Sequence, residues 1–194
     1  MRVIKLSEEA LSDTLETIKQ GGVVVCPTDT VYGLIADATN KKAVKKIFAI
    51  KKRSETKTLP VFVDSIEMAE KLVFINPEQK EFLEESWPGA KTVILKAKLG
   101  IKISKLLTKD NTVALRIPEY KFITDLIFEL GNPLAQTSAN ISGKETPNNI
   151  KDILDQLSVS EIKPDLVIDA GDLPEREASK IIDLTGEKIK ILRN

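Results

Sequence analysis

The chain of 194 residues carries 29 basic and 29 acidic residues, so its formal net charge at pH 7 is zero and a globally polycationic protein is excluded. It contains no histidine and a single cysteine, Cys26. These counts exclude imidazole bases, Ser-His-Asp triads and histidine-ligated zinc, together with disulfides within the chain. An enzyme of this composition depends on carboxylates, hydroxyls, backbone donors and cations, which suit reactions at phosphorus.

Hydrophobic residues make up 42% of the chain, which is enough to bury a core, and we expect a single domain over residues 1–194. The first residues, MRVIKLSEEALSD, do not resemble a secretory signal. The longest uncharged run, residues 130–143, is too short and too polar to span a bilayer. We therefore expect a cytoplasmic protein that does not bind a membrane.

Strands and helices are predicted to alternate along the chain. The predicted strands cover residues 3–6, 23–26, 59–63, 92–97, 112–117, 133–137, 165–171, 179–184 and 188–192. The predicted helices follow the N-caps Ser7, Asn40 and Asn76 and, further along the chain, cover residues 120–131 and 150–157. This alternation predicts an α/β fold, and the closely spaced late strands indicate a mixed sheet.

Polar side chains gather after three of the predicted strands. Residues 28–32 follow the strand 23–26, Arg116 lies at the end of TVALRI, and residues 137–140 follow PLA. Ligands of open α/β sheets collect beyond the carboxyl ends of the strands, so these three groups predict one binding site. Each group taken alone is also explained by turn chemistry, because Thr, Ser, Asn and Asp end strands and cap helices.

A basic segment covers residues 41–58, with eight basic residues and one acid, Glu55. Its first four lysines are predicted on the helix face opposite apolar residues such as Phe48, so a solvated surface explains them best. Lys51 and Arg53 are predicted beyond the last helical turn, where they can reach an anion in a pocket. A helix C-terminus that favours cations is the alternative. No Walker A or GxGxxG pattern occurs in the chain.

Five segments together resemble one known family. In chain order they are PTDTVYGL, KKR, WPGAKT, VALRIP and TSANISG. This set resembles the YrdC-type threonylcarbamoyl-AMP synthase family, in its short, single-domain form. The family signature pairs K-x-R with S-x-N, which correspond here to residues 51–53 and 138–140.

The resemblance implies a twisted, open, mixed parallel and antiparallel sheet flanked by helices, with a large positively charged cavity. It implies a nucleotidyltransferase that converts L-threonine, bicarbonate and ATP, with Mg²⁺ accompanying the ATP, into threonylcarbamoyl-AMP and pyrophosphate. The product would pass to a separate threonylcarbamoyl transferase complex, which modifies the adenosine beside the anticodon of certain tRNAs.

The resemblance also assigns roles to individual positions, with no metal ligand among them. The residues implied in catalysis are Lys51, Arg53, Ser138 and Asn140. The residues implied in binding threonine are Thr30, Arg116, Gln136 and Ser179. The residues implied in binding ATP are Arg53, Lys57, Thr112, Ser138, Thr146 and Arg193. The chain departs from the family at Phe62, where histidine is frequent, at Lys57, where asparagine is common, and at Ala90, which replaces a proline.

Two alternatives remain open from the sequence. The basic segment also suits a non-catalytic module that binds double-stranded RNA or tRNA, although its one aromatic residue, Phe48, is predicted to point inward. The second alternative is a carbamoyl-transfer enzyme that uses carbamoyl phosphate, because related modules occur in such proteins.

Overall fold

The computed structural model describes residues 1–186 and 188–193. The strands are β1 (Arg2–Lys5), β2 (Val24–Cys26), β3 (Gly33–Asp37), β4 (Val61–Phe62), β5 (Lys91–Lys96), β6 (Thr108–Lys109), β7 (Thr112–Arg116), β8 (Leu134–Ser138), β9 (Leu166–Asp169), β10 (Lys180–Asp183) and β11 (Lys190–Arg193). The helices are α1 (Glu8–Lys19), α2 (Lys41–Lys51), α3 (Ile66–Leu72), α4 (Pro77–Ser86), the 3₁₀ turn η1 (Lys105–Leu107), α5 (Lys121–Leu130) and α6 (Ile150–Leu157).

All the strands belong to one open sheet with the order β1-β9-β2-β3-β8-β4-β7-β5-β10-β11, and β6 pairs with β7 beside this path. Strand β9 runs parallel to β1 and β2, and β10 runs parallel to β5, whereas β3 is antiparallel to both β2 and β8. The prediction of a mixed parallel and antiparallel α/β sheet is therefore confirmed.

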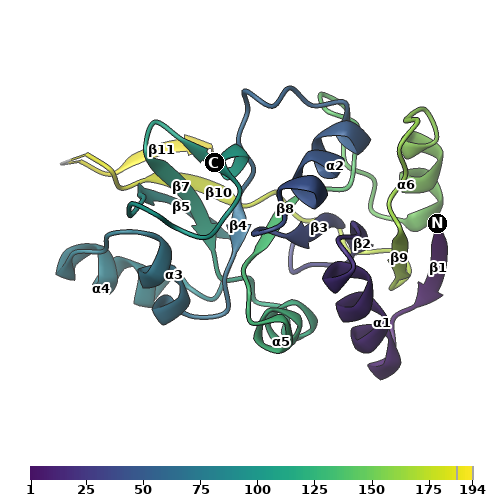
Figure 1. Cartoon of the computed structure of the whole chain (residues 1–194), viewed down its shortest axis with the longest axis horizontal. Coiled ribbons are helices and arrows are strands. Elements are labelled where there is room, and N and C mark those ends of the chain that lie inside the picture. The colour runs from purple at the N-terminus through teal and green to yellow at the C-terminus, as the bar shows by residue number, and fades with distance from the viewer. Residues whose placement is uncertain (187, 194) are drawn as a thin grey trace.

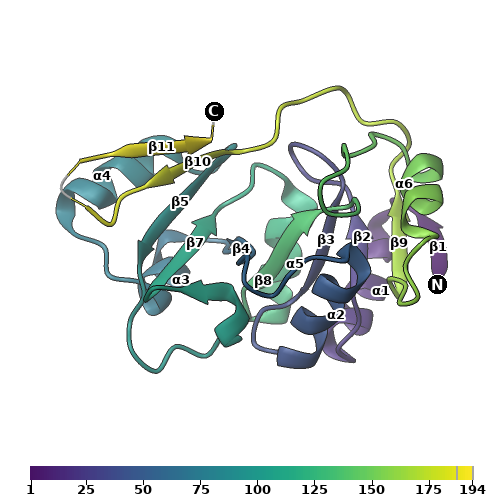
Figure 2. The same ribbon diagram turned by 90° about the horizontal axis from the view of Figure 1, so that it is seen from above.

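Strands β9 and β10 are consecutive in the sequence but lie at opposite ends of the sheet. The connection between them, residues 170–179, which we call the strap, therefore passes across the molecule. Figure 2 shows the strap as the yellow-green segment that runs from β9 on the right to β10 on the left. A segment of irregular backbone in this position crosses the strand ends that carry the polar residues.

Helices begin where side-chain caps satisfy the first free backbone N–H groups. Ser7 accepts from Ala10 N in α1, and Asn40 accepts from the backbone N–H groups of Lys42 and Ala43 in α2. Asn76 and Gln79 form a capping box at the start of α4. The helix starts that were predicted from these caps are confirmed.

Two apolar clusters hold the helices on the sheet. One takes residues from α2, α3, α4 and α6, and the other takes residues from α1 and α5. In Figure 1, α1 and α5 lie below the strands, whereas α2 and α6 lie above them. Burying one Leu or Ile side chain contributes about 1.5–3 kcal/mol, so these two clusters dominate the stability of the layers.

Three features of the fold differ from the sequence prediction. Strand β3 was not predicted, because its five residues, GLIAD, directly follow a polar turn and begin with glycine, which is uncommon in strands. Most of these residues are buried. Helix α3 was not predicted either. Lys51 was expected beyond the last turn of its helix, which is wrong: it is the last residue of α2, and Lys52 follows it in the left-handed region with φ 50°.

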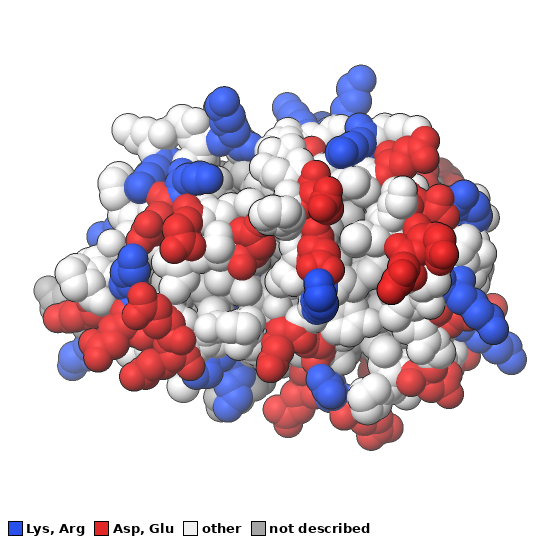
Figure 3. Space-filling model, turned by 90° about the horizontal axis from the view of Figure 1, so that it is seen from below, with Lys and Arg blue, Asp and Glu red and all other residues white. Residues whose placement is uncertain are grey.

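The surface formed by the helices below the sheet carries charges of both signs. In Figure 3, acidic side chains form several groups across this face, one of them at the end that holds α4, and basic side chains lie between these groups and along the rim. Within residues 1–186 and 188–193, no helix has the length and apolar composition needed to cross a bilayer.

Candidate active site

A cavity of about 390 Å³ is lined by residues of β5, β7, β8, β10 and β11 and by Thr30 and Val31 of the turn before β3. It collects residues from the basic segment, from the polar strand ends and from the strap. Its cationic lining residues are Arg53, Lys57, Lys109, Arg116 and Arg193. Its hydroxyl and amide lining residues are Thr30, Thr56, Thr58, Thr92, Gln136, Thr137, Ser138 and Ser179. Among the described residues no carboxylate lines this cavity, so its lining suits an anionic ligand.

The turn between β2 and β3 forms one wall of the cavity. Thr28 Oγ1 donates to Val31 O at 2.6 Å, and Thr30 N donates to Thr28 Oγ1 at 3.1 Å. The Oγ1 atoms of Thr28 and Thr30 lie 3.2 Å apart. These local bonds hold the turn rigidly, and Thr30 reaches the cavity. Residues 28–32 were explained from the sequence either as a turn or as part of a binding site. Both explanations hold in the structure, because the hydrogen bonds of the turn orient Thr30 toward the cavity.

Arg116 is the most deeply buried cation of the cavity, with 2% of its side chain exposed. Its Nη2 donates to Asp29 Oδ2 at 2.6 Å, and its Nε donates to Gly89 O at 2.8 Å. The guanidinium also lies over the ring of Phe62, 5.7 Å from the centroid. Burial lowers the pKa of Arg116 and the Asp29 carboxylate opposes that shift, so the guanidinium remains charged.

Lys51 and the S-x-N segment meet beneath the cavity. Lys51 Nζ donates to Ser138 O at 2.6 Å, to Asn140 O at 3.0 Å and to Asn140 Oδ1 at 2.6 Å, and Ser138 Oγ donates to Asn140 Oδ1 at 2.7 Å. The backbone adds Ser142 N donating to Lys51 O at 2.9 Å. These bonds tie the end of α2 to the loop after β8, so the two signature motifs are in direct contact.

Arg53 extends from the turn after α2 toward the cavity. Its Nη2 donates to Thr58 O at 3.1 Å and its Nε to Lys57 O at 3.4 Å. Burial lowers the pKa of Arg53 from its ordinary high value, and the group remains a cation. The K-x-R motif thus divides into a buried lysine that ties two segments together and an arginine that faces the cavity.

The strap and the last strand complete the opposite wall. Ser179 Oγ lies 2.9 Å from Thr92 Oγ1, and Arg193 Nε donates to Ser179 O at 2.9 Å. A second contact joins Arg193 Nη2 to Ser179 Oγ at 3.2 Å. Ser179 and Arg193, which were predicted to bind different substrates, therefore lie in direct contact.

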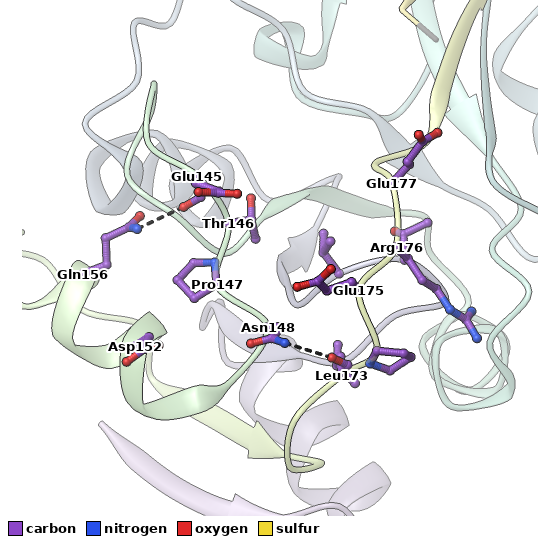
Figure 4. Close-up of a pocket in the computed structure, with 13 residues that line it drawn as sticks. Glu145, Thr146, Pro147, Asn148, Asp152, Gln156, Leu173, Glu175, Arg176 and Glu177 are labelled. Atoms are coloured by element: carbon purple, nitrogen blue, oxygen red, sulfur yellow. Dashed lines mark hydrogen bonds between the residues drawn. The ribbon is translucent and has the colours of Figure 1, made fainter.

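A second cavity of about 810 Å³ adjoins the first and shares Thr30 and Val31 with it. Figure 4 shows that it lies between the loop of residues 145–148, helix α6 and the strap. Asn148 Nδ2 donates to Leu173 O at 3.2 Å across this space. Thr146, a predicted ATP contact, lines this second cavity rather than the first.

The structure brings most of the predicted site residues together. Those that line the first cavity are Thr30, Arg53, Lys57, Arg116, Gln136, Ser138, Ser179 and Arg193. Lys51 and Asn140 lie beneath its surface. Thr112 donates to Lys109 O at 2.7 Å near the edge of the site, without lining the cavity itself. Sequence reasoning included Asp29 in the polar segment 28–32 but gave it no role of its own, and it did not select Thr92 or Lys109, because only tertiary contacts separate these residues from ordinary turn and strand residues.

The fold and the site define an α/β protein whose pocket is lined by several cationic side chains. The family described as "Telomere recombination", that of the Sua5, YciO and YrdC proteins, matches residues 16–194. The chain belongs to the Sua5/YciO/YrdC family. The five segments that suggested the resemblance all lie within the matched residues.

Individual relatives extend this result. The threonylcarbamoyl-AMP synthase of Vibrio vulnificus is 32% identical and covers 92% of this chain and 96% of its own length. The threonylcarbamoyl-AMP synthase of Bacillus subtilis is 35% identical over 79% of this chain. The structure of Pyrococcus abyssi Sua5 complexed with L-threonine superimposes with a TM-score of 0.87 at 32% identity and covers 99% of this chain. The chain spans 45% of the B. subtilis protein and 56% of the P. abyssi chain.

The names of these relatives favour an enzyme over the RNA-binding module. The position of Phe48 agrees, because it is 2% exposed in the core and is not available for stacking on a base. One outward lysine of α2 is engaged elsewhere, since Lys46 Nζ contacts Asp165 Oδ1 at 2.6 Å.

Proposed function

We propose that this chain is an L-threonylcarbamoyladenylate synthase, which converts L-threonine, bicarbonate and ATP into threonylcarbamoyl-AMP and pyrophosphate. The observation that carries the proposal is the cavity in which Thr30, Arg116 and Ser179 meet Arg53 and Arg193. The relatives named threonylcarbamoyl-AMP synthase, and the P. abyssi structure with L-threonine, support the same conclusion.

Threonine is proposed to bind on the wall formed by Thr30, Arg116, Gln136 and Ser179. Arg116 suits the carboxylate, because a guanidinium can donate two parallel hydrogen bonds to it. The Thr30 and Ser179 hydroxyls and the Gln136 amide suit the polar groups of the amino acid, as each can donate or accept.

ATP is proposed to bind toward Arg53, Lys57, Ser138 and Arg193, and to extend toward Thr112 and Thr146. Lys51 and Asn140 are proposed to keep Ser138 in place beneath the phosphates, because their own polar atoms are occupied by one another. The cavity offers hydroxyl and amide oxygens but, among the described residues, no carboxylate. It therefore fits a Mg²⁺ ion that arrives on the phosphates of ATP, where it would neutralise their charge.

The reaction needs no histidine. Bicarbonate takes up one proton and loses water to give CO₂. The free amine of threonine then adds to the carbon, and the release of one proton from nitrogen balances the first step and leaves a carbamate anion. A carbamate oxygen then attacks the α-phosphorus while the bond to the bridging oxygen breaks, and pyrophosphate leaves with that electron pair. Since the nucleophile is already an anion, the protein has to align the reactants and neutralise charge, which Arg53 and its cationic neighbours are suited to do.

The test is pyrophosphate release measured with each substrate omitted in turn. We expect release only when ATP, L-threonine and bicarbonate are all present. Replacing L-threonine and bicarbonate by carbamoyl phosphate tests the carbamoyl-transfer alternative. Turnover under that condition alone would contradict the proposal.

Arg53→Ala tests the assignment of the phosphate side. Losing a charged contact with the transition state is expected to lower kcat/KM about 100-fold or more. Lys45→Ala is the matched control, because Lys45 is an exposed cation on α2 that lines neither cavity. Full activity of Arg53→Ala would contradict the assignment of Arg53 to the phosphate side. An equal loss of kcat/KM in Lys45→Ala would also contradict it.

We propose that the product passes to a separate transferase that modifies tRNA, and that the protein acts in the cytoplasm. The product is a mixed anhydride of a carbamic and a phosphoric acid, which hydrolyses readily, so an acceptor enzyme must consume it soon after release. Whether tRNA or double-stranded RNA itself binds is tested by titrating tRNA at several salt concentrations, because phosphate contacts weaken steeply as salt rises.

A further inference from the structure

Asp29 occupies the centre of the turn between β2 and β3, and it is separate from the residues that line the two cavities. Its side chain is 6% exposed, so it is as buried as a core residue. A buried carboxylate away from the ligand surface needs a structural partner, because desolvating an unpaired charge is costly.

That partner is Arg116. Asp29 Oδ2 accepts from Arg116 Nη2 at 2.6 Å and from the backbone N–H of Glu119 at 3.0 Å. The carboxylate therefore joins the turn that carries Thr30 to the strand end that carries Arg116. Thr30 and Arg116, two of the four residues that are proposed to hold threonine, therefore depend on one carboxylate for their relative position.

The contacts of Arg116 leave a defined set of donors for a ligand. Of its five N–H groups, Nε–H is engaged by Gly89 O and one Nη2–H is engaged by Asp29. Within the described part of the chain, Nη1 has no hydrogen bond, and Arg116 lines the cavity. Nη1 and the second Nη2–H therefore remain available to a ligand, and two donors of one guanidinium can bind a carboxylate with two hydrogen bonds.

Asp29 also contacts the strap. Its backbone carbonyl accepts from Arg176 Nη1 at 2.8 Å. One residue thus holds the guanidinium of Arg116 through its side chain and the strap through its main chain. A change of the side chain should affect Arg116 while leaving the carbonyl contact in place, so the two functions are separable.

The second carboxylate oxygen of Asp29, Oδ1, allows a substitution that removes the charge and keeps the hydrogen bonds. Oδ1 is buried and, among the described residues, has no hydrogen-bond partner. An asparagine at this position can keep the accepting oxygen at Oδ2 and place its NH₂ group where Oδ1 lies, without displacing any donor. Asp29→Asn therefore removes the charge and keeps the shape, whereas Asp29→Ala removes both.

We propose that Asp29 is a positioning residue for threonine: it fixes the Arg116 guanidinium so that Nη1 and the second Nη2–H face the carboxylate of the amino acid. This inference rests on the proposed function, in which Arg116 receives that carboxylate. The role is specific to one substrate, because among the described residues Asp29 has no hydrogen bond or ion pair with the residues proposed for the phosphates of ATP.

The experiment measures KM for L-threonine and for ATP, with calorimetric binding of L-threonine as a readout independent of turnover. In Asp29→Ala we expect KM and Kd for threonine to rise about tenfold or more, because a mobile guanidinium must be ordered on binding. The KM for ATP should stay within about twofold of wild type, and Asp29→Asn should recover part of the threonine affinity.

Asp165→Asn is the matched control. Asp165 also accepts from one cation, Lys46 Nζ at 2.6 Å, and from one backbone N–H, that of Val23 at 2.7 Å, but it lies away from both cavities. We expect this variant to leave both KM values unchanged. Thermal unfolding of each variant shows whether it is folded, and Asp29→Asn, which loses no hydrogen bond, supplies the result if Asp29→Ala does not fold.

The outcomes are distinct. Unchanged threonine affinity in Asp29→Ala, or in Asp29→Asn where the alanine variant is unfolded, overturns the inference. An equal rise in both KM values, reproduced by Asp165→Asn, also overturns it, since that result indicates general loss of structure. If the wild-type chain neither binds threonine nor releases pyrophosphate in its presence, the proposed function fails instead.

Discussion

Tyr32→Phe removes the hydroxyl that fastens the start of the strap to the sheet. Tyr32 is fully buried, its Oη donates to Gly171 O at 2.8 Å, and it accepts from Ala170 N at 2.9 Å. Burial raises the pKa of Tyr32 to about 12, so the hydroxyl is neutral and able to donate at any ordinary pH. Phenylalanine keeps the ring and deletes only these two bonds.

The structure sets the expected magnitude. Leaving buried polar groups without partners costs about 1–3 kcal/mol. Gly171 is exposed, so water replaces part of its lost bond, and we expect the lower half of that range, about 1–2 kcal/mol. For a chain of this size, each kcal/mol lowers Tm by about 2–4 °C. Because the loss falls on one segment, the strap should also open more often, by about fivefold for each kcal/mol.

Two assays measure these effects. Urea denaturation, followed by the fluorescence of the buried Trp87, gives the free energy of unfolding. Limited trypsin digestion under native conditions gives the rate of cleavage after Arg176, which is an exposed strap residue. Tyr120→Phe is the control, since Tyr120 is the other tyrosine and its hydroxyl has no hydrogen bond in the part of the chain that the structure describes.

The reasoning is refuted if Tyr32→Phe and Tyr120→Phe have the same free energy of unfolding within about 0.3 kcal/mol, a difference typical of neutral surface changes. It is also refuted if the two variants are cut after Arg176 at equal rates. Either result would mean that the Tyr32 hydroxyl does not hold the strap.

Three further predictions concern single side chains. Burial lowers the pKa of Lys51 to about 7, so between pH 7 and about 10.5 the unfolded chain binds more protons than the folded chain. The unfolding free energy of wild type, measured by urea titration, should therefore rise with pH relative to that of Lys51→Met. A difference between the two proteins that does not change with pH would contradict this. Burial also raises the pKa of the Cys26 thiol. Iodoacetamide at pH 8 should therefore alkylate the native protein at least about 100 times more slowly than the urea-unfolded protein. Similar rates would show that the thiol is accessible in the native protein. In Gly22→Ala the added Cβ would lie 2.6 Å from Thr17 Cγ2 and 2.7 Å from Thr17 O, so the free energy of unfolding should fall by about 1–3 kcal/mol. Gly186→Ala is the control and should be near neutral, because a Cβ at Gly186 would meet open space. Equal effects of the two substitutions would count against the steric explanation.

Much of the fold follows from local sequence. Caps such as Asn76 and Asn149 determine helix starts, since a side-chain oxygen satisfies N–H groups only three residues away. Buried runs such as VVVC and TVAL identify strands, because apolar residues of this kind favour the interior of a sheet. Strand β3 was missed because its start, Gly33, continues a polar turn and carries no β-branched side chain.

The residue types of the site were likewise readable from the sequence, and their arrangement was not. A cation after α2 and hydroxyls after the strands indicate affinity for anions, because these chemical properties belong to the side chains themselves. The contact between Lys51 and Ser138, like that between Asp29 and Arg116, joins residues 87 positions apart, so no local pattern reports it.

By itself, then, the sequence determined the α/β class, the helix caps and the motifs that place this chain in its family, because these depend on neighbouring residues and on side-chain chemistry. Only the tertiary structure decided that β9 and β10 lie at opposite ends of the sheet, that the strap crosses the site, and that Asp29 and Lys51 are buried beneath it. The physical reason is that strand order and buried ion pairs are settled by long-range packing and hydrogen bonding, which act between segments that the linear sequence keeps apart.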